Sequence, residues 1–440
     1  MSTSYWCATA WLPTGATSNV RVEVDGAVIS AVEVGVEVTA SDVPLAGVVL
    51  PGFANAHSHA FHRALRGHTH AARGDFWSWR EEMYRVAGML DPSTLYDLAR
   101  AVYAEMVLAG VSAVGEFHYV HHPAAGGRYD DPNAMGEALR SAAADAGLRL
   151  TLLDTCYLTS GIDREAEGVA RRFADADADA WADRVSLLRP DDGFLVGAAV
   201  HSVRAVPRDH LPTVAAWARE RSAPVHAHLS EQPAENDACL AAYGATPTRV
   251  LADGGLLGPL STAVHAVHLS DADVTLLGGS GTTVCLCPTT ERDLADGLAP
   301  AGALREAGSP LCVGSDQQAT VDLLAEARAV EMHERLRTGR RGTLTPHDLV
   351  TALTVAGHRS IGRPEAGVLA VGAPADLVAV RLDTVRTAGI DPAQVVMVAG
   401  AADVHTVVVG GEVMVHAGEH RLGDVAGLLA AAVARIREDQ

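Results

Sequence analysis

The stretch from Leu50 to Arg63, LPGFANAHSHAFHR, combines a strand pattern with a metal-ligand pattern. The apolar run Val48–Phe53 predicts a short buried strand, and His57 and His59 follow it with one residue between them. Because side chains repeat every second residue in extended backbone, both imidazoles point the same way. Two converging imidazoles can ligate zinc, iron or a related ion. The same pattern also arises by chance in a chain with 20 histidines, so later residues must decide.

Length and composition limit the class of protein. At 440 residues the chain exceeds one typical core, so we expect one large domain and a smaller one. A hydrophobic content of 48% and a charged content of 20% are typical of soluble globular proteins. The net charge of -20 disfavours nucleic acid and anionic membrane surfaces as partners.

The expected location is the cytoplasm. The N-terminus lacks a signal-peptide pattern, and no apolar run reaches membrane-spanning length. The six cysteines are scattered and lie mostly in apolar runs, which is typical of buried thiols in a reducing compartment.

Both ends of the chain show the alternation of apolar and polar residues that predicts strands. Val20–Val34 alternates on either side of the hairpin-turn signal Asp25-Gly26, and Val404–Val409 continues the pattern near the other end. We therefore expect a small β-sandwich domain built from residues 1–50 and 367–440, with a final helix from about Val425 to Glu438.

The middle of the chain, residues 51–366, alternates strand and helix patterns. Eight strands, each followed by a helix, predict a (β/α)₈ TIM barrel and so an α/β fold. The long connection from Arg66 to Asp91 is expected to help build the site. The eight candidate strands are Val48–Phe53, Val111–Gly115, Arg149–Thr155, Phe194–Val200, Pro224–Ala227, Thr262–Ala266, Thr282–Cys287 and Pro310–Val313.

The ends of these strands are unusually polar. In such barrels the carboxyl ends of the strands build the active site. Five of the eight ends carry histidine, which is hard to obtain from packing alone. The polar residues at the ends are His57, His59, Glu116, His118, His201, His226, His228, Glu231, His265, His268 and Asp316.

A metal site follows from this arrangement. His57 and His59 come from strand one, one histidine comes from strand five, and the carboxylate of Asp316 comes from strand eight. Three nitrogens and one oxygen leave room for a water molecule, as in catalytic rather than structural sites. Glu231 and His265 could carry protons between that water and a leaving group.

All 34 basic residues are arginine. A carboxylated lysine, which bridges two metals in some hydrolases of this fold, therefore cannot form. A mononuclear site is favoured, which indicates hydrolysis of a C–N bond by a deaminase or an amidine hydrolase.

The chain resembles the amidohydrolase superfamily, and within it the formimidoylglutamate deiminase (N-formimino-L-glutamate deiminase) family. The resemblance covers essentially the whole chain. Its motifs are Leu50–Phe61, Phe76–Glu81, Met83–Arg85, Gly115–Tyr119, His201–Val206, His228–Gln232 and Cys287–Glu291.

The resemblance implies a mechanism and a substrate. It implies one zinc ion, with iron and manganese left open, and a homodimer. The substrate would be a small dicarboxylate amidine, N-formimino-L-glutamate of histidine degradation, which yields N-formyl-L-glutamate and ammonia. The implied metal ligands are His57, His59, His228 and Asp316; the proton-handling residues are Glu231, His265 and Asp316; and the substrate-binding residues are Arg80, Tyr119, His201, Arg204 and His62.

Two departures from the family pattern leave the substrate side chain open. His62 stands where glutamine is usual, and Gln317-Gln318 follows Asp316 where serine and histidine are expected. The alternatives are a family enzyme with a shifted side-chain preference, another mononuclear deaminase acting on a nucleobase-like heterocycle, and a catalytically silent barrel that serves as a binding scaffold. The other histidines, expected to serve as packing, loop or outer residues, are His118, His121, His122, His226 and His268.

Overall fold

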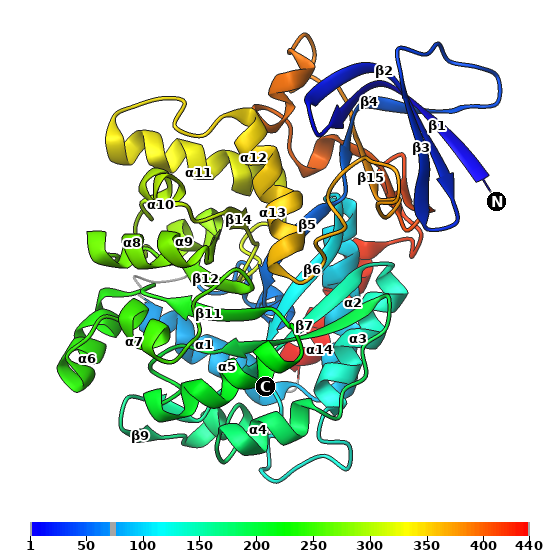
Figure 1. The fold of residues 1–440 in the computed structure, drawn as a ribbon. Coiled ribbons are helices and arrows are strands. Elements are labelled where there is room, and N and C mark those ends of the chain that lie inside the picture. Colours follow the sequence, from blue (N-terminus) through cyan, green and yellow to red (C-terminus); the bar gives the residue numbers. More distant parts are fainter. Residues whose placement is uncertain (1, 71–75, 439–440) are drawn as a thin grey trace.

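The computed structural model describes residues 2–70 and 76–438. Its centre is an eight-stranded parallel sheet that curves into a barrel (Figure 1). The strands follow one another in chain order around this sheet, and nearly all of their residues are buried. They are β5 (Phe53–Ser58), β6 (Val111–His118), β7 (Arg149–Cys156), β10 (Phe194–Val200), β11 (Val225–Leu229), β12 (Ser261–His265), β13 (Thr283–Leu286) and β14 (Leu311–Val313).

The barrel closes between its first and last strands through two backbone hydrogen bonds. The Asp316 N–H donates to the carbonyl of His57, and the His59 N–H donates to the carbonyl of Asp316, each at 3.0 Å. A Cβ atom on Gly314 would lie 2.6 Å from the His57 carbonyl oxygen, so only glycine allows this approach. We call the contact between residues 57–59 and 314–316 the seam.

Helices cover the outside of the barrel, and several begin with side-chain caps. Asp91 accepts the backbone N–H of Thr94 at the start of α2, with Pro92 in the first turn. The α-helices are α1 (Phe76–Met89), α2 (Pro92–Leu108), α3 (Ala134–Ala146), α4 (Ala178–Val185), α5 (Leu211–Glu220), α6 (Pro233–Tyr243), α7 (Pro247–Asp253), α8 (Asp271–Ser280), α9 (Pro288–Asp293), α10 (Ala301–Ala307), α11 (Leu323–Thr338), α12 (Pro346–Leu353), α13 (Val355–Ser360) and α14 (Val425–Glu438). Short 3₁₀ turns are η1 (Ala60–Leu65), η2 (Gly168–Arg172), η3 (Arg208–His210), η4 (Pro392–Met397) and η5 (Ala401–Asp403).

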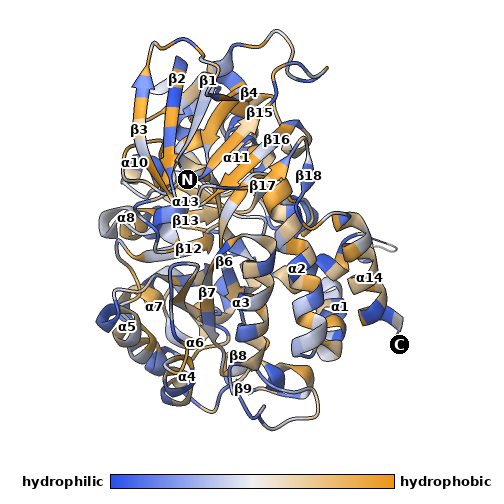
Figure 2. Cartoon of the chain, turned by 90° about the vertical axis from the view of Figure 1, so that its right-hand side faces the viewer, coloured by the Kyte–Doolittle hydropathy of each residue, from blue (hydrophilic) through white to orange (hydrophobic). Residues whose placement is uncertain are grey.

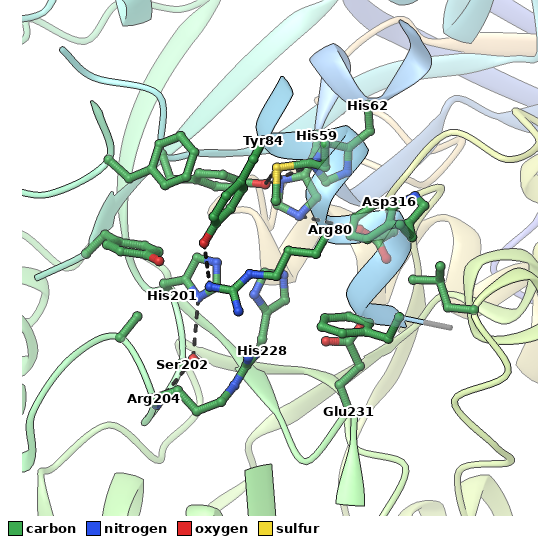
Figure 3. A pocket seen from close by; sticks show the side chains of 18 of the residues that line it. His59, His62, Arg80, Tyr84, His201, Ser202, Arg204, His228, Glu231 and Asp316 are labelled. Carbon is green, nitrogen blue, oxygen red and sulfur yellow. Dashed lines mark hydrogen bonds and ion pairs between the residues drawn. The ribbon is translucent and has the colours of Figure 1, made fainter. Parts of the chain in front are cut away.

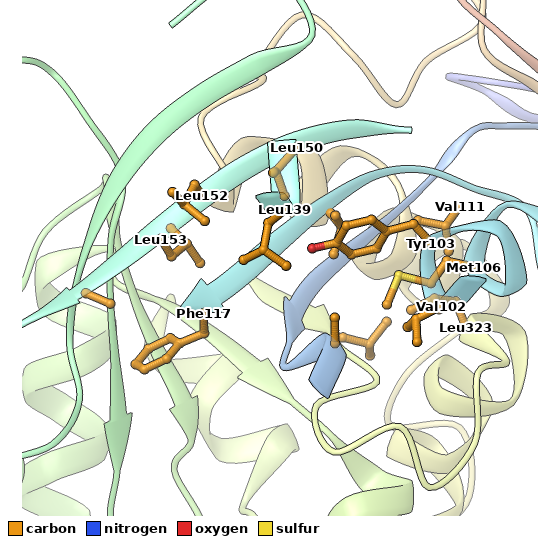
Figure 4. Packing of buried hydrophobic residues seen from close by; sticks show 14 of the residues in the cluster. Val102, Tyr103, Met106, Val111, Phe117, Leu139, Leu150, Leu152, Leu153 and Leu323 are labelled. Atoms are coloured by element: carbon orange, nitrogen blue, oxygen red, sulfur yellow. The ribbon is translucent and has the colours of Figure 1, made fainter. Parts of the chain in front are cut away.

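The apolar faces of these helices meet the outer face of the barrel. Figure 4 shows Tyr103 and Met106 of α2 and Leu139 of α3 beside Leu150 and Leu152 of β7, all within one buried cluster. Burying such side chains contributes about 1.5–3 kcal/mol each, so this layer holds the strands that carry the site.

The two ends of the chain form a second eight-stranded sheet beside the barrel (Figure 1). Figure 2 shows apolar and polar residues alternating along β2, whereas β15 and β16 are mostly apolar. Its strands, in spatial order, are β18 (Glu419–His420), β17 (Glu412–His416), β16 (Val404–Val409), β15 (Leu377–Val380), β4 (Val43–Pro51), β1 (Ser2–Leu12), β2 (Gly15–Asp25) and β3 (Val28–Val34). A separate hairpin pairs β8 (Thr159–Gly161) with β9 (Arg164–Glu165).

The predicted fold class is confirmed: a parallel barrel with a β-rich unit from both chain ends. We propose, as predicted, that residues 1–50 with 367–440 form one domain and residues 51–366 the other; the two separate sheets support this division. In the described residues, no helix combines the length and apolar character needed to cross a membrane.

One strand prediction is wrong. Val48 lies in β4 of the terminal sheet, whereas the first barrel strand is β5, so His57 lies inside a strand rather than after it. The two strands are separated by Gly52, where a Cβ atom would lie 2.3 Å from Ser112 Oγ. The continuous apolar run hides this change of sheet because both strands are buried. The other seven barrel strands agree with prediction to within a few residues.

Candidate active site

A pocket lies at the carboxyl ends of the barrel strands. Its lining combines histidines and carboxylates with arginines and aromatic rings. Figure 3 shows the guanidinium of Arg80 directed toward Tyr84 and His201, with Asp316 and Glu231 on the other side of the view. The predicted site-building connection supplies α1 and therefore Arg80; its residues 71–75 lie outside the described part of the chain.

Four predicted ligands lie close together at the seam. Nε2 of His57 and Nε2 of His59 each lie 3.4 Å from Asp316 Oδ1. Nε2 of His228 lies 3.1 Å from Nε2 of His57. A tetrahedral zinc ion with bonds of about 2.0–2.1 Å separates its ligand atoms by roughly 3.3 Å. The donors of His57, His59 and Asp316, which all lie within 4.8 Å of one another, therefore fit one shared zinc ion. His228 adjoins them through His57 and forms a second group of donors with His57 and His265.

The protonation of the imidazoles also fits a metal. Burial lowers the pKa of His57 to about 3 and lowers the pKa values of His59 and His228. Neutral imidazole is the form that ligates. Nδ1 of His59 lies 2.8 Å from the carbonyl of Phe117, a contact that directs Nε2 toward Asp316.

Two groups that could carry protons face this donor set. Nε2 of His265 lies 3.8 Å from Glu231 Oε1 and 3.8 Å from Asp316 Oδ2. Burial raises the pKa of Glu231, which suits a carboxyl that must hold a proton. His265 has φ 71° and Asp316 has φ 42°, backbone conformations that side chains other than glycine rarely adopt and that cluster at functional sites.

The opposite part of the pocket carries two guanidinium groups. Arg80 donates to the hydroxyl of Tyr84, and its guanidinium lies 4.9 Å from the centre of the Tyr84 ring. Arg204 donates through Nε to Glu235 Oε2 at 2.9 Å. Glu235 in turn accepts the Ser230 N–H at 3.0 Å and is buried. Glu235 therefore fixes the position of Arg204.

The remaining predicted contacts also line the pocket. Nε2 of His62 lies 2.9 Å from the hydroxyl of Tyr119, and its Nδ1 is buried without a hydrogen-bond partner among the described residues. His201 packs edge-on against Tyr119 and Tyr157, with ring centres 5.3 and 4.8 Å apart. All the predicted site residues therefore converge on one pocket or on the donor set that adjoins it.

Other histidines at the strand ends lie elsewhere. His226 points away from the donor set, with Nε2 2.8 Å from the carbonyl of Ser360. His268 contacts the carbonyl of Asp296 at 2.8 Å. The remaining three, His118, His121 and His122, lie near Asp154 and Asp175 in a separate buried cluster.

Sequence reasoning missed several residues of the pocket. Tyr84 follows Arg80 by four residues on α1, and this spacing places two side chains on one helix face. The spacing therefore could have identified Tyr84 as a neighbour of Arg80. Cys287 also lies at the donor set, since Sγ and donor atoms of His265 and Asp316 fall within 4.8 Å of one another. No pattern identifies Tyr157 or Glu235, because their roles depend on packing between distant segments.

The family is settled by comparison with known proteins. Residues 48–414 match the amidohydrolase family. The chain belongs to this family. The amidohydrolase is 37% identical over 384 residues to the formimidoylglutamate deiminase of Pseudomonas aeruginosa, with 84% of each protein covered.

Two solved structures resemble this amidohydrolase along its whole length. An amidohydrolase from Brucella melitensis is 32% identical, with a TM-score of 0.92 and coverage of 99% of this chain and 100% of the other. Atrazine chlorohydrolase from Arthrobacter aurescens, solved in complex with zinc, has a TM-score of 0.88 at 22% identity, with 99% and 100% coverage. The second likeness establishes the shared fold alone.

Proposed function

We propose that this amidohydrolase is a zinc-dependent deiminase that converts N-formimino-L-glutamate and water into N-formyl-L-glutamate and ammonia. One observation carries the proposal: a single pocket joins a donor set for one metal ion to two guanidinium groups. The named activity of the Pseudomonas aeruginosa relative supports it. A dicarboxylate with a formimino group at one end matches both halves of the pocket.

The residues divide into three roles. His57, His59, His228 and Asp316 would hold the zinc ion, and a bound zinc ion supplies Lewis acidity and activates water. Glu231 gives a proton to the terminal nitrogen, so that the C–N bond breaks and ammonia leaves. His265, between Glu231 and Asp316, receives and passes on the proton that the attacking water loses.

The guanidinium groups bind the other end of the substrate. A guanidinium holds a carboxylate through two parallel N–H donors, which fixes orientation as well as charge. Among the described residues, no carboxylate pairs with Arg80, so none of them competes with a substrate carboxylate for its cation. The pocket wall between the metal donors and the guanidinium groups is completed by Tyr119, His201 and His62.

We also propose that the enzyme acts in the cytoplasm as a homodimer, as the family resemblance implies. All six cysteines are buried and free, which supports a reducing compartment.

Ammonia release tests the proposed activity directly. The zinc-loaded protein is expected to act on N-formimino-L-glutamate faster than on N-formimino-L-aspartate or an N-guanidino analogue. Stripping the metal with a chelator should abolish turnover, and zinc should restore it more fully than iron or manganese. Equal and negligible rates on all three acids, or preference for a nucleobase-like heterocycle, would overturn the proposal.

The Arg80→Met variant is expected to lower kcat/KM on the dicarboxylate substrate by about 30- to 150-fold, the equivalent of about 2–3 kcal/mol for a charged hydrogen-bonded contact. Steady-state kinetics measure this change. Arg208→Met is the matched control, because Arg208 lies outside the pocket and is mostly exposed. Equal kcat/KM values for wild type and Arg80→Met would remove Arg80 from the binding role.

A further inference from the structure

A chain of buried side-chain hydrogen bonds crosses the seam beneath the donor set. Asn55 Nδ2 donates to Ser315 Oγ at 2.7 Å, and Ser315 Oγ donates to Gln318 Oε1 at 2.8 Å. Gln318 Nε2 donates to Ser58 Oγ at 2.9 Å, and Ser58 Oγ donates to Glu116 Oε2 at 2.7 Å. Each hydroxyl gives one bond and receives one, so the chain runs in one direction and ends on the Glu116 carboxylate.

Gln318 is the link that joins the two sides of the seam. Its Nε2 donates both to Ser58 Oγ and to the carbonyl of Asp316, each at 2.9 Å. Its side chain is fully buried, as are those of Ser58 and Ser315. One of these side-chain bonds, from Gln318 Nε2 to Ser58 Oγ, ties the loop after β14 to the strand β5. The other two, to Ser315 and to the carbonyl of Asp316, hold the loop itself in shape.

The residues that these bonds join are neighbours in the chain of the proposed metal ligands. Ser58 lies between His57 and His59, and its partner Glu116 also accepts the Ala60 N–H at 2.6 Å. On the other side, Asp316 has φ 42°, a conformation that persists only when the surroundings hold it. The backbone contributes two hydrogen bonds at the same place. Together with these backbone bonds, the chain of side-chain hydrogen bonds holds the backbone of Asp316 beside the segment His57–His59.

We infer that Gln318 is a positioning residue that sets the affinity of the site for zinc, without itself touching the ion. The inference rests on the proposed metal site. Groups that orient metal ligands typically change metal affinity 10- to 100-fold when they are removed. Gln318 does so for three of the four ligands at once, because it binds the loop of Asp316 to the segment His57–His59.

Two variants test this inference. Gln318→Glu keeps the shape and replaces the double donor with an acceptor; Gln318→Met removes all three bonds. Zinc retained by the full-length holoenzyme is measured against graded concentrations of a chelator. Both variants are expected to hold zinc about 10- to 100-fold more weakly than wild type. Gln317→Met is the matched control, because the Gln317 amide donates to Asp293 at 2.8 Å, away from the seam, and its zinc affinity should stay within twofold.

The outcomes separate this inference from the proposed function. A wild-type protein that holds no zinc overturns the proposed function. If wild type and both Gln318 variants hold zinc equally well, only the role of Gln318 is overturned. The same conclusion follows if the metal-free variants have a lower Tm but an unchanged zinc affinity.

A double-mutant cycle with Ser58→Ala gives a second test that does not depend on Gln318→Met folding. The losses in zinc affinity from Ser58→Ala and Gln318→Glu should be smaller together than their sum, because both break one chain. Additive losses would contradict the inference.

Discussion

The Glu231→Gln variant is expected to keep its zinc content and to lose about a hundredfold or more in kcat. The carboxamide has the size of the carboxyl but cannot exchange a proton at neutral pH. Glu231 lines the pocket, and its Oε1 lies 3.8 Å from Nε2 of His265. Because the metal donors are other residues, the defect should appear in kcat rather than in metal binding. Steady-state ammonia release and metal analysis of the same sample measure both.

A control fixes the interpretation of this result. Glu306→Gln makes the same chemical change at an exposed position and should leave kcat unchanged. Near wild-type turnover by zinc-loaded Glu231→Gln would remove the carboxyl from proton transfer. Loss of zinc in this variant would mean that Glu231 supports the metal rather than the leaving group.

The Arg184→Met variant is expected to lower the free energy of unfolding by about 3–5 kcal/mol, the typical cost of breaking a buried ion pair by removing one partner. Arg184 bonds both oxygens of Asp154 at 2.9 Å and Asp175 Oδ2 at 2.9 Å. All three side chains are buried. Methionine keeps much of the volume but leaves two carboxylates without their cation. Denaturant unfolding monitored by circular dichroism measures the change.

A partly exposed ion pair provides the control for this stability measurement. Arg305 pairs with Asp348 at 2.8 Å, and 46% of the Arg305 side chain is exposed. Arg305→Met should cost less than about 1 kcal/mol. Equal effects of the two substitutions would contradict the view that burial makes the Arg184 network costly to break.

The effect of Arg184 should also depend on pH. Burial raises the pKa values of Asp154 and Asp175, but Arg184 at Asp154, and His122 with Arg184 at Asp175, lower the pKa values of both carboxyls below the usual range. A carboxyl with a lowered pKa in the folded state stabilises it above the unfolded pKa of about 3.9, and this contribution is lost as the pH falls through the folded value. The difference in stability between wild type and Arg184→Met should therefore shrink below about pH 4.

The barrel could be predicted because each strand is a short apolar run followed by polar residues. The same property locates the metal donors, since the carboxyl ends of parallel strands meet at one end of a barrel. The exception is the first strand. The apolar run Val48–Phe53 spans the end of β4 and the start of β5, and hydropathy cannot show that the chain passes from one sheet to another at Gly52.

The supporting contacts could not be predicted from the sequence. Gln318 and Ser58 are 260 positions apart in the chain, and only the closing of the barrel brings them together. From the sequence alone, the departure from the family pattern at Gln318 leaves the substrate side chain open. In the structure its carboxamide makes three hydrogen bonds, which the two ring nitrogens of a histidine could not reproduce.

Because the chain passes directly from β4 to β5 through Gly52, the outer sheet supports the first strand of the barrel. β4 ends at Pro51, β5 starts at Phe53, and the Gly52 N–H is anchored to the carbonyl of Asp376 near the start of β15. His57 follows only five residues later. Removing strands of the outer sheet from either terminus would therefore weaken the contacts that hold β5, the strand that leads to His57 and His59. A variant that lacks these terminal strands is thus expected to bind metal more weakly while its barrel helices stay folded.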